Sequence, residues 1–452
     1  MSEDSSPVDQ GDTERIKAQA RRVAIRVLNR FAQSTKSMHA VLRDFLREEH
    51  PETDLFMMVQ ALTMSTVRYL NTIDFVISRS RPPIVAKELP GLERSALRLA
   101  VYEGRWLRTP LNVLESTYLE NYEHLRPALS RAVSAPLNRL TARLSEEERL
   151  GVLYSHPTFL VSTLIEHLPR DEVVDLLRAD LEPRTYYVRP NLLRFNAVEM
   201  VASLLEQGID TVPDPDVEGL FRVVEGADKI VRSSLFKEGK ILIQDKASVL
   251  TVRALDPKPG ETVWDACAAP GMKTQAIWEM MGREGRLVAS DIHEGRLRAA
   301  VERAASLGYS DVCWIRTDAS TAPVREADKI LIDAPCTSTG ILRSRPSFKW
   351  RLNKRVLMGI MSIQHKILDG IVSSYVGRPG VRILYATCSL LPHEGESQID
   401  SLLSSHSIEL LDVPIKGASP GYSGFECSDK VRRFFPHRHD TSGFFIALFE
   451  IV

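Results

Sequence analysis

Residues 262–274 read T-V-W-D-A-C-A-A-P-G-M-K-T and establish the pattern of the C-terminal half of the chain. Residues 262–266 suit a buried strand, Gly271 lies in the following turn, and residues 273–281 have the periodicity of a helix. Further strands are expected at 286–290, 311–316, 329–332, 381–386 and 444–450, and helices at 294–306 and 355–376. Strands alternating with helices predict a doubly wound α/β sheet, which binds nucleotide-like cofactors where its strand order reverses.

The single glycine of this turn, Gly271, narrows the class of cofactor. A dinucleotide site requires G-x-G-x-x-G and a P-loop requires two glycines before Lys-Ser/Thr, so a pyrophosphate cradle is disfavoured. Asp291 ends the second strand, where a carboxylate can accept both hydroxyls of a ribose, and Asp318 follows the third, where it could reach an adenine amine. Each aspartate alone could equally cap a helix. Carboxylates at successive strand ends favour a cofactor with ribose and adenine but no pyrophosphate, S-adenosylmethionine.

Two later strands are followed by cysteines. Residues 329–340 read K-I-L-I-D-A-P-C-T-S-T-G and contain Cys336, and residues 382–389 read R-I-L-Y-A-T-C-S and contain Cys388. Carbon 5 of a pyrimidine is a poor nucleophile, but a thiolate that adds to carbon 6 turns the ring into an enamine whose carbon 5 can accept a methyl group. Asp333 could then hydrogen-bond a cytosine, and a second group must take the proton from carbon 5. These residues alone leave open which thiol attacks.

The bulk composition limits the other possibilities. Cys267, Cys313 and Cys427 are expected to be small buried residues, and the odd total of five cysteines without a C-x-x-C pair argues against disulfides and structural zinc. His437 and His439 lack further ligands at metal-binding spacing, so no metal is expected. A hydrophobic content of 44% and the lack of a long apolar run indicate a globular protein without a membrane span. The acidic, polar N-terminus lacks the features of a secretory signal or a transit peptide, so an intracellular, cytoplasmic protein is expected.

Residues 343–355, R-S-R-P-S-F-K-W-R-L-N-K-R, carry six basic residues, two aromatic residues and no acidic ones. This mixture suits contacts with phosphates and stacking on bases. A solvated surface loop would explain the same charges, and charge alone favours that interpretation.

The N-terminal half has a different pattern and the chain is therefore expected to be multidomain. Residues 1–12 are polar and are expected to form a disordered leader. Apolar residues recur at helical spacing throughout residues 13–150, and this stretch contains no cluster of acids, bases or thiols. Residues 151–240 mix helices with a strand near R-T-Y-Y-V-R-P-N and are expected to form a small α+β subdomain that binds RNA or links its neighbours. Residues 241–452 hold the α/β domain.

Several of these stretches resemble the motifs of RNA 5-methylcytosine methyltransferases of the RsmB type. They are D-A-C-A-A-P-G-M-K-T (265–274), L-I-D-A-P-C-T-S-T-G (331–340), R-S-R-P-S-F-K-W-R (343–351), Y-A-T-C-S-L-L-P-H-E-G-E (385–396) and F-P-H-R-H-D-T-S-G-F-F (435–445). In the helical half, A-R-R-V-A-I-R-V-L, E-R-S-A-L-R-L-A-V-Y-E and P-L-N-R-L look like the NusB-type RNA-binding domain. The resemblance implies a Rossmann-like methyltransferase domain behind a NusB-like domain.

The resemblance also implies roles for individual residues. The cysteine of the T-C-S motif, Cys388, matches the nucleophile of the family, and Cys336 matches the cysteine that assists product release beside Asp333. Cofactor contacts are implied for Cys267, Ala268, Ala269, Pro270, Gly271, Met272, Lys273, Asp291, Asp318 and Asp333. Ser338 stands where many members have glycine, which could narrow the pocket beside Cys336.

The sequence therefore predicts an S-adenosylmethionine-dependent RNA cytosine carbon-5 methyltransferase that acts through a covalent adduct between cysteine and carbon 6. Ribosomal RNA is the first expected substrate, because the NusB-like extension resembles that of rRNA-modifying members, and transfer RNA is the second. A non-catalytic RNA-binding or ribosome-assembly factor on the same fold stays open. So does a DNA cytosine methyltransferase, whose nucleophile would be the cysteine after the proline, Cys336.

Overall fold

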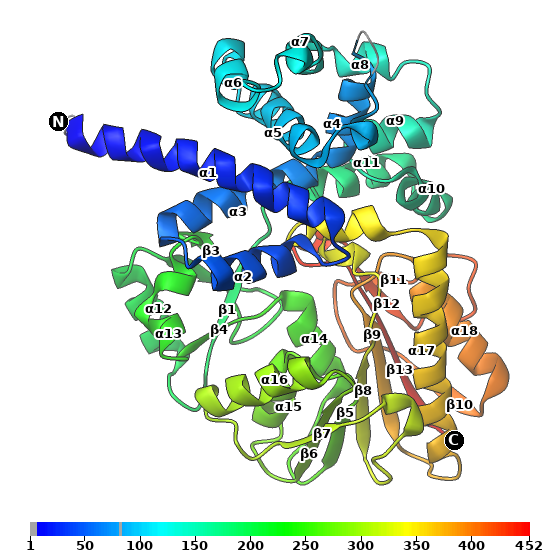
Figure 1. Cartoon of the computed structure of the whole chain (residues 1–452). Helices are drawn as coiled ribbons and strands as arrows, with labels where there is room; N and C mark the ends of the chain where they lie inside the picture. The colour runs from blue at the N-terminus through cyan, green and yellow to red at the C-terminus, as the bar shows by residue number, and fades with distance from the viewer. Residues whose placement is uncertain (1–6, 81–83) are drawn as a thin grey trace. The chain divides into compact units, whose positions relative to one another are not determined.

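A computed structural model of the chain describes residues 7–80 and 84–452. The chain forms two compact units (Figure 1). The first comprises Met1–Leu181 and Ser344–Leu352, and the second comprises Glu182–Arg343 and Asn353–Val452. In the described part of the chain, no helix is both long and apolar enough to cross a membrane.

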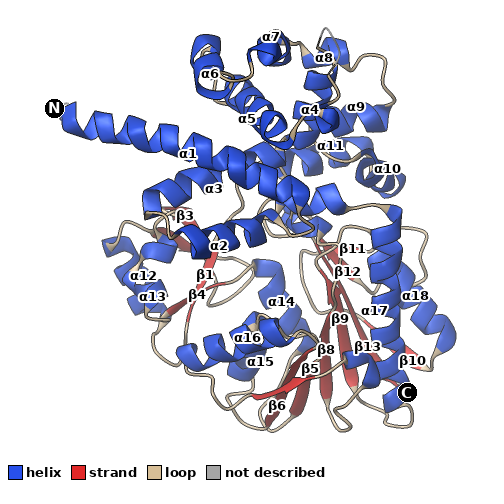
Figure 2. Ribbon diagram, viewed as in Figure 1, coloured by secondary structure: helices blue, strands red, loops and turns tan. Residues whose placement is uncertain are grey.

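The first unit is helical, as the sequence predicts (Figure 2). Its helices are α1 Pro7–Gln33, α2 Met38–Glu49, α3 Thr53–Arg68, α4 Leu70–Ser78, α5 Gly91–Trp106, α6 Leu111–Tyr118, α7 Arg126–Ser134, α8 Leu137–Leu140, α9 Glu146–Leu153, α10 Thr158–His167 and α11 Arg170–Ala179, with 3₁₀ turns η1 Ala86–Glu88 and η2 Glu123–Leu125. Apolar residues at helical spacing on α1, among them Ala20, Val23 and Val27, are buried in its core.

The limits of this unit differ from the predicted boundaries. Asn71 of α4 donates hydrogen bonds to the carbonyls of Gly151 (2.8 Å) and His156 (2.9 Å). Residues 151–181 therefore extend the helical unit, although their sequence suggested the start of the α+β subdomain. At the other end, α1 begins at Pro7, inside the predicted disordered leader, and residues 1–6 of that leader lie outside the described residues.

The basic segment is not the solvated surface loop that its charges favoured, because its central residues are buried, whereas Arg345, Lys354 and Arg355 are exposed. Its 3₁₀ helix η6, Pro346–Arg351, packs in the helical unit. The Trp350 indole donates a hydrogen bond to the carbonyl of Val67 (2.7 Å), and the Met38 amide donates one to the Ser347 hydroxyl (3.2 Å). Lys349 is only 1% exposed. Tertiary packing of Trp350 against the helical core explains this placement, which local charge could not predict.

Burial in this segment lowers the pKa of Lys349 to about 7, and the nearby Asp180 only partly opposes that effect. Between pH 7 and the ordinary lysine pKa of about 10.5, the unfolded chain binds a proton that the folded chain lacks. The stability of the helical unit should therefore rise with pH across that window. Lys349→Met should remove this rise and stabilise the unit at pH 7, because the methionine has no charge to bury.

Thermal unfolding of the full chain between pH 6.5 and 9 measures this effect. Lys354→Met, which changes an exposed lysine of the following helix, is the matched control and should leave the pH dependence unchanged. A Lys349→Met variant with the wild-type pH dependence would contradict the assignment.

The second unit begins with a small antiparallel sheet of order β2-β3-β1-β4. Its elements are β1 Tyr187–Pro190, α12 Ala197–Glu206, β2 Asp210–Pro213, β3 Phe221–Glu225, η3 Ile230–Arg232, α13 Ser234–Lys237 and β4 Ile241–Ile243. Apolar residues of β1, β3 and α12, including Val188, Phe221 and Met200, form a separate core beneath it. The predicted strand near residue 187 forms, and α12 is one of the helices expected in this stretch.

The main sheet of the second unit has nine strands in the described part of the chain and confirms the doubly wound prediction (Figure 2). Its path is β11-β12-β13-β9-β8-β5-β6-β7, with β10 paired to β13. The strands are β5 Thr262–Asp265, β6 Arg286–Asp291, β7 Cys313–Arg316, β8 Lys329–Asp333, β9 Arg382–Thr387, β10 Ile408–Leu411, β11 Ser419–Pro420, β12 Arg432–Phe434 and β13 Phe444–Ile451. The helices are α14 Lys246–Leu255, α15 Met272–Met280, α16 Glu294–Leu307, α17 Lys354–Tyr375, α18 Glu396–Ser405 and α19 Pro436–His439, with η4 Ala319–Thr321, η5 Thr339–Ile341 and η7 Pro392–Glu394.

The strand order places the carboxyl ends of β5, β6, β8 and β9 along one edge. The strands β7-β6-β5-β8-β9 are parallel, and the chain changes direction at β5, from which β6 and β8 leave on opposite sides. Ligands of doubly wound sheets bind at such a reversal. Cys313 lies on the edge strand β7 and is exposed, so its prediction as a buried residue is wrong, whereas Cys427 is buried as predicted.

Candidate active site

The two thiols that the sequence singles out lie in contact. Cys336 follows β8 and Cys388 follows β9, and their Sγ atoms are 3.1 Å apart. The neighbouring parallel strands bring them together, because Asp333 of β8 is in register with Ala386 of β9. The Gly340 amide also donates a hydrogen bond to the Cys388 carbonyl (2.9 Å), which joins the two loops directly. The fold itself therefore brings the two thiols together at the carboxyl ends of neighbouring strands.

The two thiols differ in acidity. The hydrogen bond from Cys336 lowers the pKa of Cys388 below its ordinary value, with Ser338 and Lys273 acting in the same direction, against burial and the charge of Asp333. The same hydrogen bond with Cys388, together with burial, raises the pKa of Cys336. Cys388 is thus the more acidic of the two thiols, and Cys336 keeps its proton more readily.

A buried carboxylate that sequence reasoning missed ties the two thiol loops together. Glu394 of η7 is 0% exposed, and its Oε1 accepts hydrogen bonds from the Thr337 amide (2.8 Å) and the Gln364 amide group (3.1 Å). Its Oε2 accepts from the hydroxyls of Thr337 and Ser389, each at 2.5 Å. Thr337 follows Cys336 and Ser389 follows Cys388, so one carboxylate fixes both loops. The first glutamate of P-H-E-G-E was the available signal, since an isolated acid among buried residues needs partners.

The second glutamate of that motif, Glu396, helps to hold the loop that follows Cys388. Glu396 forms a fully buried ion pair with Arg433 of β12 (2.5 Å). The Arg433 guanidinium also donates to the carbonyls of Ser389 (3.2 Å) and Leu391 (3.5 Å) and lies 4.2 Å from the centroid of the Tyr422 ring. The loop after Cys388 is therefore held on two sides by buried charges that are paired and hydrogen-bonded.

A lysine from the predicted cofactor loop lies beside the thiols. Lys273 of α15 donates a hydrogen bond to Asp333 (2.7 Å). Burial alone would lower the pKa of Lys273, but Asp333 overcomes that effect and the pKa is raised, so the amine stays charged. Asp265, at the end of β5, accepts from the Thr274 hydroxyl (2.6 Å), and burial raises its pKa to about 7. These groups form a polar floor where β5 and β8 end.

The other predicted cofactor residues lie along the same edge. Asp291 is 3% exposed and its Oδ1 accepts from the His293 amide (2.8 Å), while Asp318 accepts from the Ser320 amide (3.0 Å). In each aspartate, one carboxylate oxygen therefore accepts a hydrogen bond within its own turn, as expected if these residues cap the helices that follow. The loop from Cys267 to Gly271 closes through a bond from the Gly271 amide to the Ala268 carbonyl (2.7 Å). Gly271 has φ +92°, which explains the single glycine of the turn.

The structure thus brings Cys336, Cys388, Asp333 and Lys273 into one cluster, with the loop of residues 267–273 and Asp291 beside it on β5 and β6. Asp318 follows β7, and its carboxylate accepts a hydrogen bond within its own turn rather than from the cluster. No group of side chains suited to hold a metal ion occurs among the described residues.

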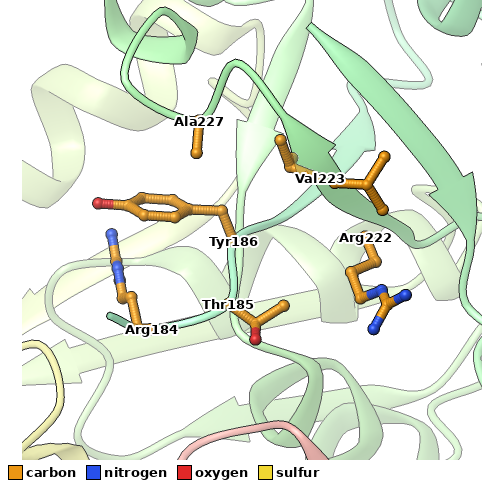
Figure 3. Close-up of a pocket in the computed structure, with 7 residues that line it drawn as sticks. Arg184, Thr185, Tyr186, Arg222, Val223 and Ala227 are labelled. Atoms are coloured by element: carbon orange, nitrogen blue, oxygen red, sulfur yellow. The ribbon is translucent and has the colours of Figure 1, made fainter. Parts of the chain in front are cut away.

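A separate hollow of about 330 Å³ lies on the small sheet. Arg184, Thr185 and Tyr186 line it from the segment before β1, and Arg222, Val223 and Val224 line it from β3, with Ala227 beyond (Figure 3). The Arg184 guanidinium lies 4.1 Å from the centroid of the Tyr186 ring, and Arg222 pairs with Asp440 at 3.4 Å. The hollow therefore offers two exposed guanidinium groups and an aromatic ring.

Comparison with known proteins agrees with these observations. Residues 252–450 match the family described as 16S rRNA methyltransferase RsmB/F, and residues 18–121 match the NusB family. A probable ribosomal RNA small subunit methyltransferase B of Synechocystis is 28% identical over 85% of this chain and 89% of its own length. The ribosomal RNA small subunit methyltransferase B of Yersinia pseudotuberculosis is 27% identical over 94% of this chain and 97% of its own length.

A human 28S rRNA (cytosine(4447)-C(5))-methyltransferase is 28% identical over 71% of this chain, which spans 40% of that longer protein. Among solved structures, that of PH0851 covers 96% of this chain and 98% of its own, with a TM-score of 0.78 and 28% identity. A methyltransferase homologue from Pyrococcus horikoshii covers 68% of this chain and all of its own, with a TM-score of 0.61 and 28% identity. The thiol site and these matches agree on one conclusion: residues 252–450 are similar to the RsmB/F methyltransferases, and residues 18–121 of the helical unit are similar to the NusB family.

Proposed function

We propose that this protein is an S-adenosylmethionine-dependent RNA methyltransferase that methylates carbon 5 of a cytosine in ribosomal RNA. The observation that carries the proposal is the contact between the Sγ atoms of Cys336 and Cys388 at 3.1 Å, beside Asp333 and Lys273. Two thiols of unequal acidity suit a reaction that needs a nucleophile first and a proton acceptor later. Relatives named for rRNA methylation support ribosomal RNA as the substrate.

In the first step, Cys388 acts as the nucleophile. Its thiolate forms a bond to carbon 6 of the cytosine, and the electron pair of the 5,6 double bond makes carbon 5 nucleophilic. Asp333, kept in place by Lys273, is positioned to hydrogen-bond the base. When bound, S-adenosylmethionine would supply the electrophilic methyl group that carbon 5 takes up. Removal of the carbon 5 proton then lets the bond between carbon 6 and Cys388 break, which restores the double bond and the thiolate.

Cys336 is suited to take that proton because its pKa depends on the state of Cys388. In the free enzyme, the hydrogen bond and the charge of Cys388 raise the pKa of Cys336 and keep it protonated. Once the Cys388 sulfur is bonded to carbon 6, it carries no charge, so the largest cause of the raised pKa disappears. Cys336 can therefore lose its own proton to solvent more readily at this stage, and the thiolate that results accepts the proton from carbon 5.

The residues along the strand ends fit the proposed cofactor. Oδ1 of Asp265 is buried and has no hydrogen-bond partner among the described residues, so the floor of the site holds an unsatisfied polar atom. The single-glycine turn leaves room for a ligand without a pyrophosphate, and Asp291 provides a carboxylate at the end of β6. Asp291 would hold the ribose hydroxyls, Asp318 the adenine, and the loop of residues 267–273 the remaining part of the cofactor.

The RNA would contact the second unit at the hollow on the small sheet. Its exposed guanidinium groups, Arg184 and Arg222, suit phosphate oxygens, and the Tyr186 ring suits an unpaired base. Because these groups carry no pattern of donors and acceptors for one base, they would add affinity for RNA rather than sequence choice. The NusB-family region would add further RNA contacts in the helical unit.

Asp291→Ala is expected to weaken cofactor binding by about 1.5–3 kcal/mol, because it removes a charge-assisted hydrogen bond from the ribose. Isothermal titration of the full chain with S-adenosylmethionine measures the change. Glu294→Ala, which removes an exposed carboxylate of α16, is the matched control and should bind like the wild type. Unchanged affinity in Asp291→Ala would remove Asp291 from the cofactor site.

The proposed function is tested most directly by sequencing bisulfite-treated RNA from cells that lack this protein. The loss of one 5-methylcytosine in ribosomal RNA, restored by the wild-type gene but not by a Cys388→Ala variant, is the expected result. A lost site in transfer RNA would keep the chemistry and correct the substrate. No lost site, together with no binding of S-adenosylmethionine by the purified chain, would favour a scaffold that binds RNA without turnover.

A further inference from the structure

The loop between the two thiols contains a residue in an unusual backbone conformation. Ser338 has φ +59° and ψ +30°, in the left-handed region that serine seldom adopts. A side chain in this region raises the energy of the backbone, and such conformations persist where the surroundings enforce them and often accompany function. Glycine would avoid this energy cost, so the presence of a side chain at this position needs an explanation.

The neighbours of Ser338 enforce its conformation from both sides. Before it, the Thr337 amide donates a hydrogen bond to Glu394 (2.8 Å). After it, the Thr339 hydroxyl accepts from the Leu390 amide (2.9 Å), and the Gly340 carbonyl accepts from the Gly443 amide (2.8 Å). A Cβ at Gly340 would lie 1.9 Å from the Gly443 carbonyl oxygen, so this approach is as close as glycine permits. The loop cannot relax around Ser338 without breaking these bonds.

The enforced conformation directs the Ser338 hydroxyl to the thiol pair. The Cys388 thiol donates a hydrogen bond to the Ser338 Oγ across 3.6 Å, and the Sγ of Cys336 lies 4.0 Å from the same oxygen. The nearer sulfur is the more acidic one, and once Cys388 has lost its proton only the hydroxyl can donate a hydrogen bond across this contact. An O–H group donates well to a thiolate, and a donated hydrogen bond favours the charged form of its acceptor.

We propose that Ser338 is a third polar group of the reaction centre, whose hydroxyl donates a hydrogen bond to the Cys388 thiolate and holds it ready for attack. The inference rests on the proposed function, in which Cys388 is the nucleophile. Glycine or alanine at this position would leave the thiolate with Cys336 as its near donor. Ser338 therefore sets how much of Cys388 is ionised at neutral pH.

Other charged groups near Cys388 also affect its ionisation. Lys273, from α15, favours the thiolate, whereas Asp333, at the end of β8, disfavours it. Glu394, from η7, acts on the neighbouring Cys336 and helps to keep that thiol protonated. None of these groups is changed by a substitution at Ser338, so a shift in the titration of Cys388 can be assigned to the hydroxyl.

Alkylation of the full-length wild type, S338G and S338A by iodoacetamide from pH 5.5 to 9.5, with peptide mass spectrometry of Cys388, tests the proposal. Both variants should show a higher midpoint for the reaction of Cys388 and a rate at pH 7 that is about three- to tenfold lower. S338G relieves the backbone and should melt at or above the wild-type temperature, whereas S338A keeps the strained φ. A loss of reactivity without a loss of stability is not expected of a residue with only a structural role.

The covalent adduct with substrate RNA provides the second measurement. Adduct formation by both variants should be slower at pH 7 and approach the wild-type rate at pH 9, where Cys388 ionises without help. Wild-type alkylation midpoints for Cys388 in both variants would overturn the proposal. Alkylation needs neither RNA nor cofactor, so altered midpoints in a protein that methylates no RNA would refute the proposed function while leaving the hydrogen bond in place.

Discussion

The Cys336→Ala variant is expected to accumulate a covalent protein–RNA adduct, and the Cys388→Ala variant is expected to form none. With Cys388 intact, the thiolate can still add to carbon 6 and the methyl group can still be accepted, but the group that takes the carbon 5 proton is absent. The adduct should therefore survive denaturing electrophoresis. On the proposed mechanism, the loss of Cys388 removes the nucleophile. Turnover should fall about 10³-fold or more in both variants, so that only the adduct distinguishes them.

The experiment mixes each variant with substrate RNA and S-adenosylmethionine and separates the products on a denaturing gel. Cys313→Ala, which removes an exposed thiol on β7, is the matched control and should turn over normally. An adduct from Cys388→Ala but not from Cys336→Ala would reverse the assignment and make Cys336 the nucleophile, as in the DNA cytosine methyltransferases considered above.

Glu394→Gln is expected to reduce turnover by about 10²-fold while leaving cofactor affinity unchanged. The amide keeps the size of the carboxylate, but its NH₂ group faces donors, Thr337 on one side or Ser389 on the other. The two hydroxyls must then accept instead of donate, and the charge-assisted bonds between the thiol loops become weaker neutral ones. A displacement of the sulfurs of about 1 Å is enough for an effect of this size. Because the group is fully buried, the unfolding free energy should also fall by about 1–3 kcal/mol.

The kinetic measurement is kcat and KM for RNA, alongside calorimetry with the cofactor and thermal unfolding. Thr337→Val is the graded control, because it removes one hydroxyl bond to Glu394 and keeps the amide bond. It should lose less activity than Glu394→Gln. Full turnover in a folded Glu394→Gln protein would show that the carboxylate serves only the stability of the loops.

The sequence predicts those parts of the structure that depend on local pattern. Runs such as I-L-I before Asp333 and I-L-Y before Thr387 have the composition of buried parallel strands, and both form where expected. The thiols could be paired in advance because parallel neighbouring strands end at the same edge of a sheet. The short strands β10, β11 and β12 escaped prediction, since two to four residues are too few to show a period.

The sequence does not predict contacts between residues that are far apart in the chain. Glu394 acts on Thr337, and nothing in the local pattern around either residue indicates the other. The hydroxyl of Ser338 looks like a neutral replacement of a glycine until its φ and its distance from Cys388 are known. Lys349 looks like a surface charge until Trp350 is seen to carry its segment into the helical core. In each case tertiary structure, rather than residue type, determines the role.

The placement of residues 344–352 has a consequence for how the protein can be divided. The chain passes between the two units at residues 181/182, 343/344 and 352/353, so no single cut yields two complete modules. A fragment that starts at residue 182 would carry Trp350 without the Val67 carbonyl that accepts its hydrogen bond. A fragment that ends at residue 181 would lack the same indole from its core. The core of the helical unit is thus completed by a segment from the second half of the chain, and exchange of this unit between proteins would require the transfer of two separate pieces of gene.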